Sequence, residues 1–313
     1  MLHTILLSLL PMFFVLALGF YAGKRQRVDN VHIESLNSLL MRFALPCSLF
    51  LTTANASLGM LQQQLSLFVL LVLSMLLLFG FSYGLERLLW RQNPPLAAVQ
   101  ACTVALPNYA AVGIPLLATV ISPTESLAVA VAIIAGSVII SPLTLFFLQS
   151  KPATGTGAER WAVLITLLNI LRNPVVLAPL AGTLLAILQW PLPDYLRAAF
   201  SLMGVAVGGI ALFVTGLLVS AQPFRLDRHI LLSALLKNVL HPALVYGLAL
   251  LLALPREVTQ AVVLLAAIPS GFFGILFGVN QRLPYTLSGA TLLCSTVLGI
   301  PTLVLTIALL PAL

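Results

Sequence analysis

Long apolar tracts alternate with short polar turns along almost the whole chain. A helix that crosses a membrane needs about 20 mainly apolar residues, because it rises about 1.5 Å per residue across a hydrocarbon core about 30 Å thick. Ten tracts are close to this length or exceed it, at 4–22, 33–54, 65–89, 96–120, 125–148, 172–189, 195–220, 229–254, 257–280 and 285–310. The pattern predicts an all-α integral membrane protein with ten transmembrane helices.

Composition and charge agree with a membrane protein. Hydrophobic residues make up 60% of the 313 residues and charged residues 7%, whereas roughly 25% of the residues in a soluble domain are charged. Cytoplasmic loops of membrane proteins carry an excess of Lys and Arg. Of the 15 basic residues, 11 fall in the connections after odd-numbered tracts, at Lys24, Arg25, Arg27, Arg87, Arg91, Lys151, Arg160, Arg172, Arg225, Arg228 and Arg282. This distribution predicts that both termini are extracellular or periplasmic, at the plasma membrane (the inner membrane of a bacterium). It explains the net charge of +7, so no nucleic-acid partner is expected.

The two halves of the chain repeat each other. A shift of 163 residues aligns Pro11 with Pro174, Gly19 with Gly182 and Tyr83 with Tyr246, and a slightly smaller shift aligns Pro107 with Pro269 and Pro142 with Pro301. Each half holds five tracts, so the second half must cross the membrane with the opposite polarity, as in the inverted repeats of many transporters. The predicted units are a first five-helix repeat at 1–148, a cytoplasmic linker at 149–160 and an inverted repeat at 161–313.

Tracts 96–120 and 257–280, the fourth and the ninth, are interrupted at matching positions. The interrupting residues are Pro107, Asn108, Gly113 and Pro115 in the fourth tract and Pro269, Ser270, Gly271 and Gly274 in the ninth. Proline inside a helix costs about 3 kcal/mol or more, and unwound backbone at membrane depth occurs only where it is buried in protein or lines a cavity. Paired interruptions in two repeats point to a binding site at the midplane, formed by crossed discontinuous helices. The lone prolines Pro46 and Pro142 predict only kinks.

The chemistry of this predicted site favours an anion. Because the two tracts run in opposite directions, both second half-helices would present their N-termini at the midplane, where the helix dipole and free N–H groups attract negative charge. Asn108 and Ser270 add an amide and a hydroxyl donor. Lys237 and Arg42 lie about nine residues inside their tracts, where a cation serves the substrate or gating by default; the alternative is that each side chain extends to the cytoplasmic interface.

The acidic residues limit how transport is coupled to an ion. All eight fall in loops or at tract ends, at Asp29, Glu34, Glu86, Glu125, Glu159, Asp194, Asp227 and Glu257, so no midspan carboxylate is available as a proton relay. Sodium held by carbonyls and by hydroxyls such as those of Ser270 and Thr296 stays open, as do exchange and facilitated diffusion. The histidines and cysteines have no metal-ligand spacing. We therefore expect no metal, cofactor or enzyme activity.

Other classes of membrane protein fit the sequence less well. A channel would need rings of pore-lining groups, an intramembrane protease would need paired catalytic residues, and a receptor or scaffold would not need two matched broken tracts. An anion channel nevertheless stays open as an alternative, and both a monomer and a homodimer are compatible with the pattern.

At this point the chain resembles the auxin efflux carrier family, which includes plant PIN carriers and bacterial malate and malonate permease-like proteins. The resemblance covers nearly all of the chain and rests on LGFYAGKRQRV, LNSLLMRFALPCSLF, PNYAAVGIPLL, RNPVVLAPLAGTLL, ALFVTGLLVS, LKNVLHPAL and AAIPSGFFGILFGVNQ. It implies a ten-helix fold similar to the bile-acid sodium symporters, with crossed helices 4 and 9 and an organic anion bound beside the crossing. Members commonly read N-x-G-F-L-G-L-P-L in the fourth helix, whereas this chain reads NYAAVGIPL from Asn108. The resemblance thus implies a carrier of a small organic anion, with a sodium-coupled symporter of the bile-acid type as the alternative, and does not identify the substrate.

Overall fold

The computed structural model describes residues 2–28, 35–36, 38–121, 126–148, 174–222 and 226–312. The predicted linker 149–160 lies outside these residues, as do Lys151, Arg160, Arg172 and Arg225. The described part of the chain is helical, apart from one isolated bridge between two extended segments.

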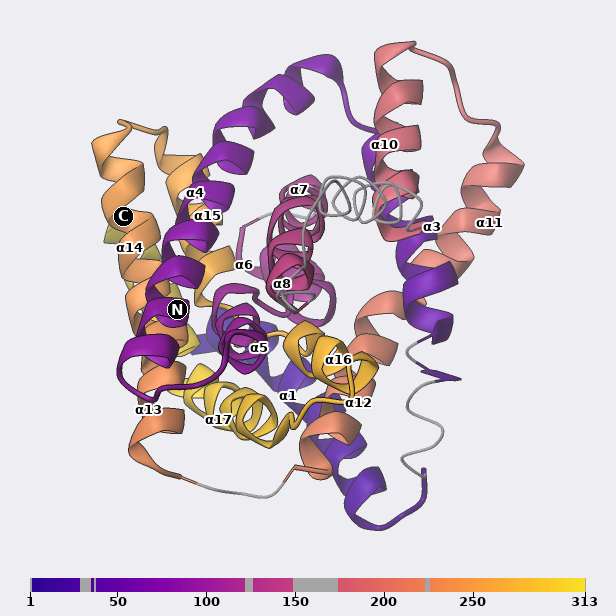
Figure 1. Cartoon of the computed structure of the whole chain (residues 1–313). Helices are drawn as coiled ribbons and strands as arrows, with labels where there is room; N and C mark the ends of the chain where they lie inside the picture. The colour runs from indigo at the N-terminus through magenta and orange to yellow at the C-terminus, as the bar shows by residue number, and fades with distance from the viewer. Residues whose placement is uncertain are drawn as a thin grey trace, which may run out of the picture.

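Each apolar tract is occupied by one helix or by a consecutive run of helices (Figure 1). The elements of the first half are α1 (Leu2–Lys24), η1 (Leu40–Ala44), α3 (Leu45–Ala54), α4 (Leu58–Leu88), α5 (Pro94–Ala105), η2 (Tyr109–Gly113), α6 (Ile114–Val120), α7 (Ser126–Ala135), η4 (Gly136–Ile140) and α8 (Ser141–Leu148). Those of the second half are α10 (Pro174–Ile187), α11 (Asp194–Gly204), α12 (Ala206–Ser220), α13 (Arg228–Leu235), η5 (Leu236–Leu240), α14 (His241–Leu251), α15 (Arg256–Ala267), α16 (Phe273–Asn280), α17 (Thr286–Leu309) and η6 (Leu310–Ala312).

Five helical stretches of the described chain are long and apolar enough to cross a membrane. They are Gln64–Leu88, Leu127–Leu148, Asp194–Ser220, Arg228–Leu251 and Thr286–Leu309. Shorter apolar helices cover Leu9–Lys24, Leu40–Ala54, Pro94–Ala105, Tyr109–Val120 and Pro174–Ile187. The predicted all-helical membrane architecture is thus confirmed at the level of helix content and apolar length.

Proline shapes four of these helices without ending them. A π-helical turn precedes each of Pro46, Pro115, Pro142 and Pro242, and the proline is always the second residue after the turn. Proline has no N–H and its ring clashes with the carbonyl of the preceding turn, so the wider π turn relieves the clash. The lone prolines Pro46 and Pro142 therefore distort their helices without interrupting them, as expected.

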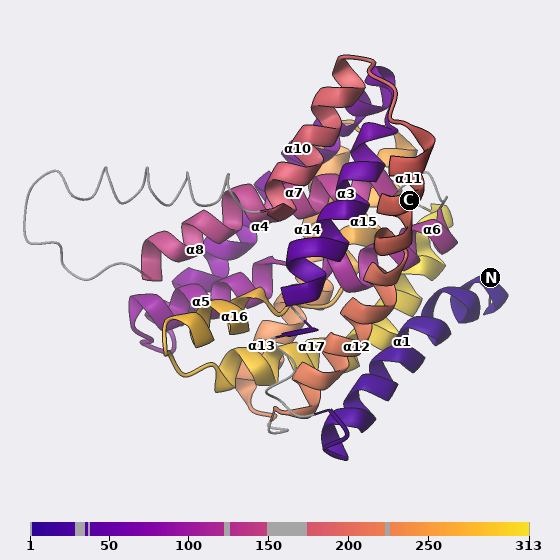
Figure 2. The same cartoon turned by 90° about the vertical axis from the view of Figure 1, so that its right-hand side faces the viewer.

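Two long helix pairs pack with their backbones close together. The helix α1 runs beside α12, and α10 runs beside α3 (Figure 2). Glycine permits both contacts, because a methyl group at Gly19 would overlap the carbonyl oxygen of Phe213, and one at Gly182 would overlap that of Phe50. The helices α3, α10 and α11 lie to the right of the interrupted helices in Figure 1.

The interrupted helices lie in the centre of the molecule. Every residue of 97–105 in α5 and of 261–267 in α15 is buried, and both segments belong to the largest apolar cluster, together with parts of α4 and α7. Most of the residues in these two segments are alanine or valine, which lets neighbouring helices approach closely. The core therefore surrounds the two places where the helices break.

Candidate functional site

The two predicted interruptions meet. The helix α5 ends at Ala105 and α15 ends at Ala267, and the next segments form an antiparallel bridge between Pro107 and Ser270. The backbone N–H of Asn108 donates to the carbonyl of Pro269 at 2.9 Å, and that of Gly271 donates to the carbonyl of Leu106 at 2.8 Å. These bonds replace helical hydrogen bonds that the breaks remove, as buried backbone requires.

The predicted glycines allow close packing around the bridge. A Cβ atom at Gly271 would lie 2.9 Å from the carbonyl oxygen of Leu106, so a side chain there would disturb the bridge. A Cβ at Gly274 would lie 2.7 Å from the carbonyl oxygen of Val99 and would overlap the Thr103 hydroxyl, where α16 crosses α5.

After Asn108 the fourth tract is helical again, and this part contains Gly113 and Pro115, the other two predicted site residues of the tract. Gly113 ends the π turn η2 and packs against Val129, and Pro115 lies in the first turn of α6. The structure therefore gives Gly113 and Pro115 packing positions away from the cavity wall, as it does Gly271 and Gly274, and their role in binding stays a prediction.

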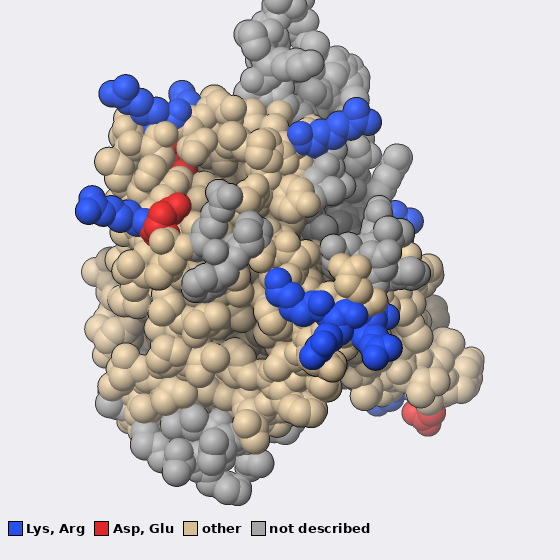
Figure 3. Space-filling model, turned by 90° about the horizontal axis from the view of Figure 1, so that it is seen from below, with Lys and Arg blue, Asp and Glu red and all other residues tan. Residues whose placement is uncertain are grey.

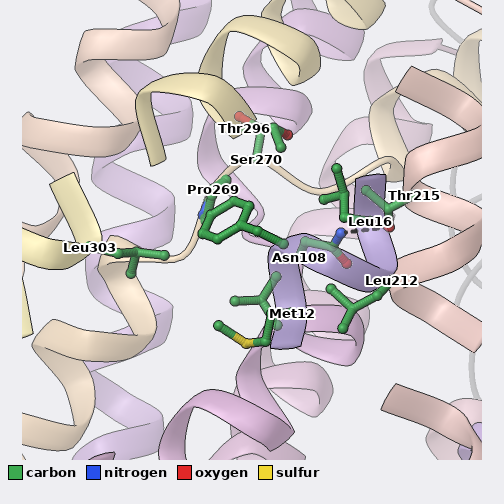
Figure 4. Close-up of a pocket in the computed structure, with 11 residues that line it drawn as sticks. Met12, Leu16, Asn108, Leu212, Thr215, Pro269, Ser270, Thr296 and Leu303 are labelled. Carbon is green, nitrogen blue, oxygen red and sulfur yellow. Dashed lines mark hydrogen bonds between the residues drawn. The ribbon is translucent and has the colours of Figure 1, made fainter. Parts of the chain in front are cut away.

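A small cavity adjoins the bridge. Its volume is about 10 Å³, which is about the minimum for one water molecule. One wall comes from α1 and α12 and the other from the crossing segments and α17 (Figure 4), through Met12, Phe13, Leu16, Leu212 and Thr215 on the first and Asn108, Val112, Pro269, Ser270, Thr296 and Leu303 on the second. A cavity of this volume has no room for an organic anion.

Two polar atoms in this cavity wall have no partner in the described chain. The Asn108 amide nitrogen donates to the Thr215 hydroxyl at 3.0 Å, and Thr215 in turn donates to the Ala211 carbonyl at 2.7 Å. The Thr215 hydroxyl must therefore accept from Asn108, which fixes the amide orientation. Asn108 Oδ1 and Ser270 Oγ are then left buried without a hydrogen bond, at a cost of about 1–3 kcal/mol each. A water molecule or ligand would remove this cost.

Lys237 contacts the end of α15, just before the bridge in the sequence, and is completely buried. Its amine donates to the carbonyl of Ala266 at 2.6 Å, in the last turn of α15, and lies 2.9 Å from His241 Nδ1. The predicted burial of this cation is correct, and its hydrogen bonds stabilise the end of a half-helix. Arg42, by contrast, is exposed and does not line the cavity.

The next residue, Asn238, is linked through Ser295 to the segment that follows the end of α15. Its amide nitrogen donates to the Ser295 carbonyl at 2.8 Å, and the Ser295 hydroxyl donates to Asn238 Oδ1 at 2.6 Å. The backbone N–H of Ser270 donates to this hydroxyl at 2.9 Å. Sequence reasoning did not single out Asn238, Ser295 or Thr215; the available signal was a polar residue inside an apolar tract.

The described residues contain no cluster of three or more histidine, cysteine or acidic side chains that could hold a metal ion. The donors around the bridge are amide, hydroxyl and amine groups. This chemistry suits a small polar solute.

Two broken apolar helices that cross inside a helical bundle, beside a closed cavity with unpaired polar atoms, are typical of a membrane transporter. The model of the Membrane transport protein family matches residues 4–307, and the chain belongs to this family. The resemblance to auxin efflux carriers is thereby confirmed. The protein is an integral membrane transport protein.

Two relatives cover nearly the same length. An uncharacterized transporter, YfdV, of Escherichia coli K12 is 28% identical over 298 residues, which is 93% of each chain. A putative malonate transporter of Rhizobium meliloti is 25% identical over 301 residues, which is 94% of this chain and 92% of the relative.

Proposed function

We propose that the protein carries a small organic anion, a mono- or dicarboxylate, across the membrane by alternating access around the crossing of its two broken helices. The observation that carries the proposal is the cavity at the bridge, where Asn108 and Ser270 each have a buried polar atom with no partner among the described residues. Such atoms are expected where a polar ligand binds. A dicarboxylate is the first substrate to test, since one relative is described as a putative malonate transporter.

The closed cavity suggests how the site opens. Asn108 holds Thr215 of α12 across the boundary between the two walls. When α1 and α12 move away from the crossing segments, this bond breaks and the amide N–H becomes free for a carboxylate. The Ser270 hydroxyl supplies a second donor, and the N-termini of the helices that follow the bridge add favourable dipoles. The anion would therefore replace Thr215 as the partner of Asn108.

Ten crossings in two inverted repeats are part of the proposal. Gly19 and Gly182 are related by the 163-residue shift, and so are the residues that they touch, Phe213 and Phe50. The contact of α1 with α12 thus has a counterpart in that of α10 with α3. A pseudo-two-fold axis in the membrane plane would produce such paired contacts.

The proposed topology predicts opposite sides for two exposed positions. Ser57, before α4, should face the extracellular or periplasmic side, and Gln281, after α16, should face the cytoplasm. We expect an impermeant thiol reagent applied to intact cells to label Ser57→Cys but not Gln281→Cys, in a chain whose native cysteines are replaced. Labelling of both positions from one side would contradict the topology.

Figure 3 views one face of the protein, on which basic side chains outnumber acidic ones.

The carrier function is tested with purified protein in proteoliposomes. We expect saturable uptake of radiolabelled malonate or of another member of a mono- and dicarboxylate panel, and counterflow when the vesicles are preloaded with the unlabelled anion. A channel would give uptake that rises linearly with concentration and no counterflow. Absence of both activities over the whole panel would contradict the proposed function.

Sodium coupling is the second candidate. It is favoured by one observation, because Asn108 Oδ1 is an unpaired acceptor that could bind a cation beside the hydroxyls of Ser270 and Thr296. Uptake that stops when choline replaces sodium would favour the symporter.

A further inference from the structure

In the part of the chain that the structure describes, the amine of Lys237 has two hydrogen-bond acceptors and no counter-ion. Its nitrogen lies 2.6 Å from the Ala266 carbonyl oxygen and 2.9 Å from His241 Nδ1, and the side chain is fully buried. A neutral amine has two N–H donors, whereas an ammonium group has three. The two acceptors therefore pair both N–H groups of the neutral amine and leave one N–H of the charged form unpaired.

The partner histidine can accept this bond. His241 Nε2 lies 3.5 Å from the Ser74 hydroxyl, which itself donates to the Leu71 carbonyl at 2.9 Å. Ser74 can therefore only accept from the histidine, which places the ring hydrogen on Nε2 and leaves Nδ1 as the acceptor for Lys237. Both polar ends of the ring and both N–H groups of a neutral amine are then paired.

No opposite charge faces this amine from the described helices around it. The elements that pack against η5 are α5, α13, α14, α15 and α17, and their other ionisable groups are Cys102, Arg228, His229, Tyr246, Arg256, Glu257 and Cys294. On α4, which carries Ser74, these groups are Tyr83, Glu86 and Arg87. The one buried carboxylate among them, Glu86, pairs with His229, and none of these groups forms a hydrogen bond or ion pair with Lys237. A buried ammonium without a counter-ion is strongly unfavourable.

We propose that Lys237, held by His241, is the proton-binding site of the carrier, neutral in the closed state and protonated when the crossing segments open to water. The lone pair of Lys237 Nζ takes a proton from hydronium, which leaves water, and the ammonium returns that proton to water on the other side. This inference rests on the proposed carrier function. The lack of a midspan carboxylate disfavours a buried acid as the proton carrier, and a buried amine can take that role instead.

The position of Lys237 links the proton to the anion site. Lys237 holds the last turn of α15, and the adjacent Asn238 holds Ser270 through the Ser295 hydroxyl. Protonation adds a third N–H donor and a charge next to the break. A negative ligand in the cavity at the bridge compensates that charge, so the anion and the proton favour each other's binding.

A polar route leads toward this amine from a larger cavity. The cavity has a volume of about 260 Å³ and is lined by residues that include Asp227 and Ser288. Ser288 donates to Gln100 Oε1 at 3.1 Å, and Gln100 donates to Ser233 at 3.0 Å. Ser233 lies four residues before Lys237, one helical turn away. These side chains could relay water or protons when the helices separate.

The protonation state of Lys237 can be measured without any substrate. The chain has three lysines, Lys24, Lys151 and Lys237, so lysine labelled with carbon-13 at the ε position gives few NMR signals. In the Lys24→Arg/Lys151→Arg double variant, we expect one signal at the chemical shift of a neutral amine near neutral pH. The wild-type chain should show the same signal, together with ammonium signals from the other lysines. An ammonium shift for Lys237 under these conditions would overturn the proposal.

Transport supplies the second test. With the membrane potential clamped at zero, one pH unit across the vesicle is expected to change the accumulation ratio of malonate about tenfold per coupled proton. Lys237→Gln should lose this response, and Lys237→Arg, which cannot release its proton, should stop net uptake. The exposed-lysine variant Lys24→Gln is the matched control and should respond like wild type.

The outcomes separate this inference from the proposed function. If no anion in the panel is carried but Lys237 is a neutral amine by NMR, the carrier proposal fails, while the neutral state of Lys237 in the closed protein stands. If counterflow occurs but accumulation ignores the pH gradient, or Lys237→Gln responds like wild type, the proton site is wrong and the carrier stands.

Discussion

Asn108→Ala is expected to weaken anion uptake at least about tenfold, equivalent to about 1.4 kcal/mol of lost binding free energy. Asn108 is 2% exposed and lies in the cavity wall. Its amide nitrogen donates to Thr215, and its amide oxygen has no partner in the described part of the chain. In the open state its N–H groups would pair with a carboxylate in a poorly hydrated site. Removing a hydrogen bond to a charged group there costs about 1.5–3 kcal/mol. The measurement is the half-saturating concentration of malonate, or of the best anion in the panel, in proteoliposomes.

Thr215→Val separates binding from closure of the cavity. It removes the partner of Asn108 on α12 but leaves the amide itself in place. We therefore expect Thr215→Val to bind the anion at least as tightly as wild type, because in this variant no hydrogen bond between Asn108 and residue 215 has to break before the anion binds.

Equal affinities of Asn108→Ala and wild type would move the site away from the crossing. Loss of folded Asn108→Ala protein would indicate that Asn108 only holds unwound backbone.

The hydrophobic pattern was sufficient to predict where the helices lie. Each apolar tract contains helix, and the breaks fall at Pro107 and Pro269, because proline and extended backbone have a strong local cost that does not depend on distant partners. The same pattern could not tell which face of a uniformly apolar helix points inward. It therefore could not show that Arg42 lies on an outward face of its helix, where its side chain is exposed.

The candidate site was predictable in part. Asn108 and Ser270 stood out as polar residues at matched breaks, and both line the cavity. The partners of these residues could not be found in this way, because Thr215 and Ser295 come from tracts far away in the sequence and their own tracts are unbroken at those positions. Lys237 was recognisable as an ionisable residue inside an apolar tract. Its hydrogen bond to the last turn of α15 could not be predicted, because it depends on how η5 packs against α15.

Gly19→Ala and Gly182→Ala are each expected to destabilise the protein by about 1–3 kcal/mol or more, because overpacked helices must move apart. A methyl group at Gly19 would overlap the backbone carbonyl of Phe213 in α12, and one at Gly182 would overlap that of Phe50 in α3. Backbone atoms cannot move aside by a change of rotamer. The measurement is the fraction of monodisperse protein that remains after heating in detergent.

Gly80→Ala is the matched control for both substitutions. It lies within α4, and a Cβ atom there would meet no atom of the described residues within 4 Å. Alanine is a better helix former than glycine by about 1 kcal/mol, so this variant should be as stable as wild type or slightly more stable. If the two halves are inverted repeats, Gly19→Ala and Gly182→Ala should shift the heating curve in the same direction and by similar amounts, since they disrupt equivalent contacts of α1 with α12 and of α10 with α3. A Gly19 or Gly182 variant that behaves like Gly80→Ala would show that the backbone contact is dispensable, and a large effect at only one of the two would argue against equivalent halves.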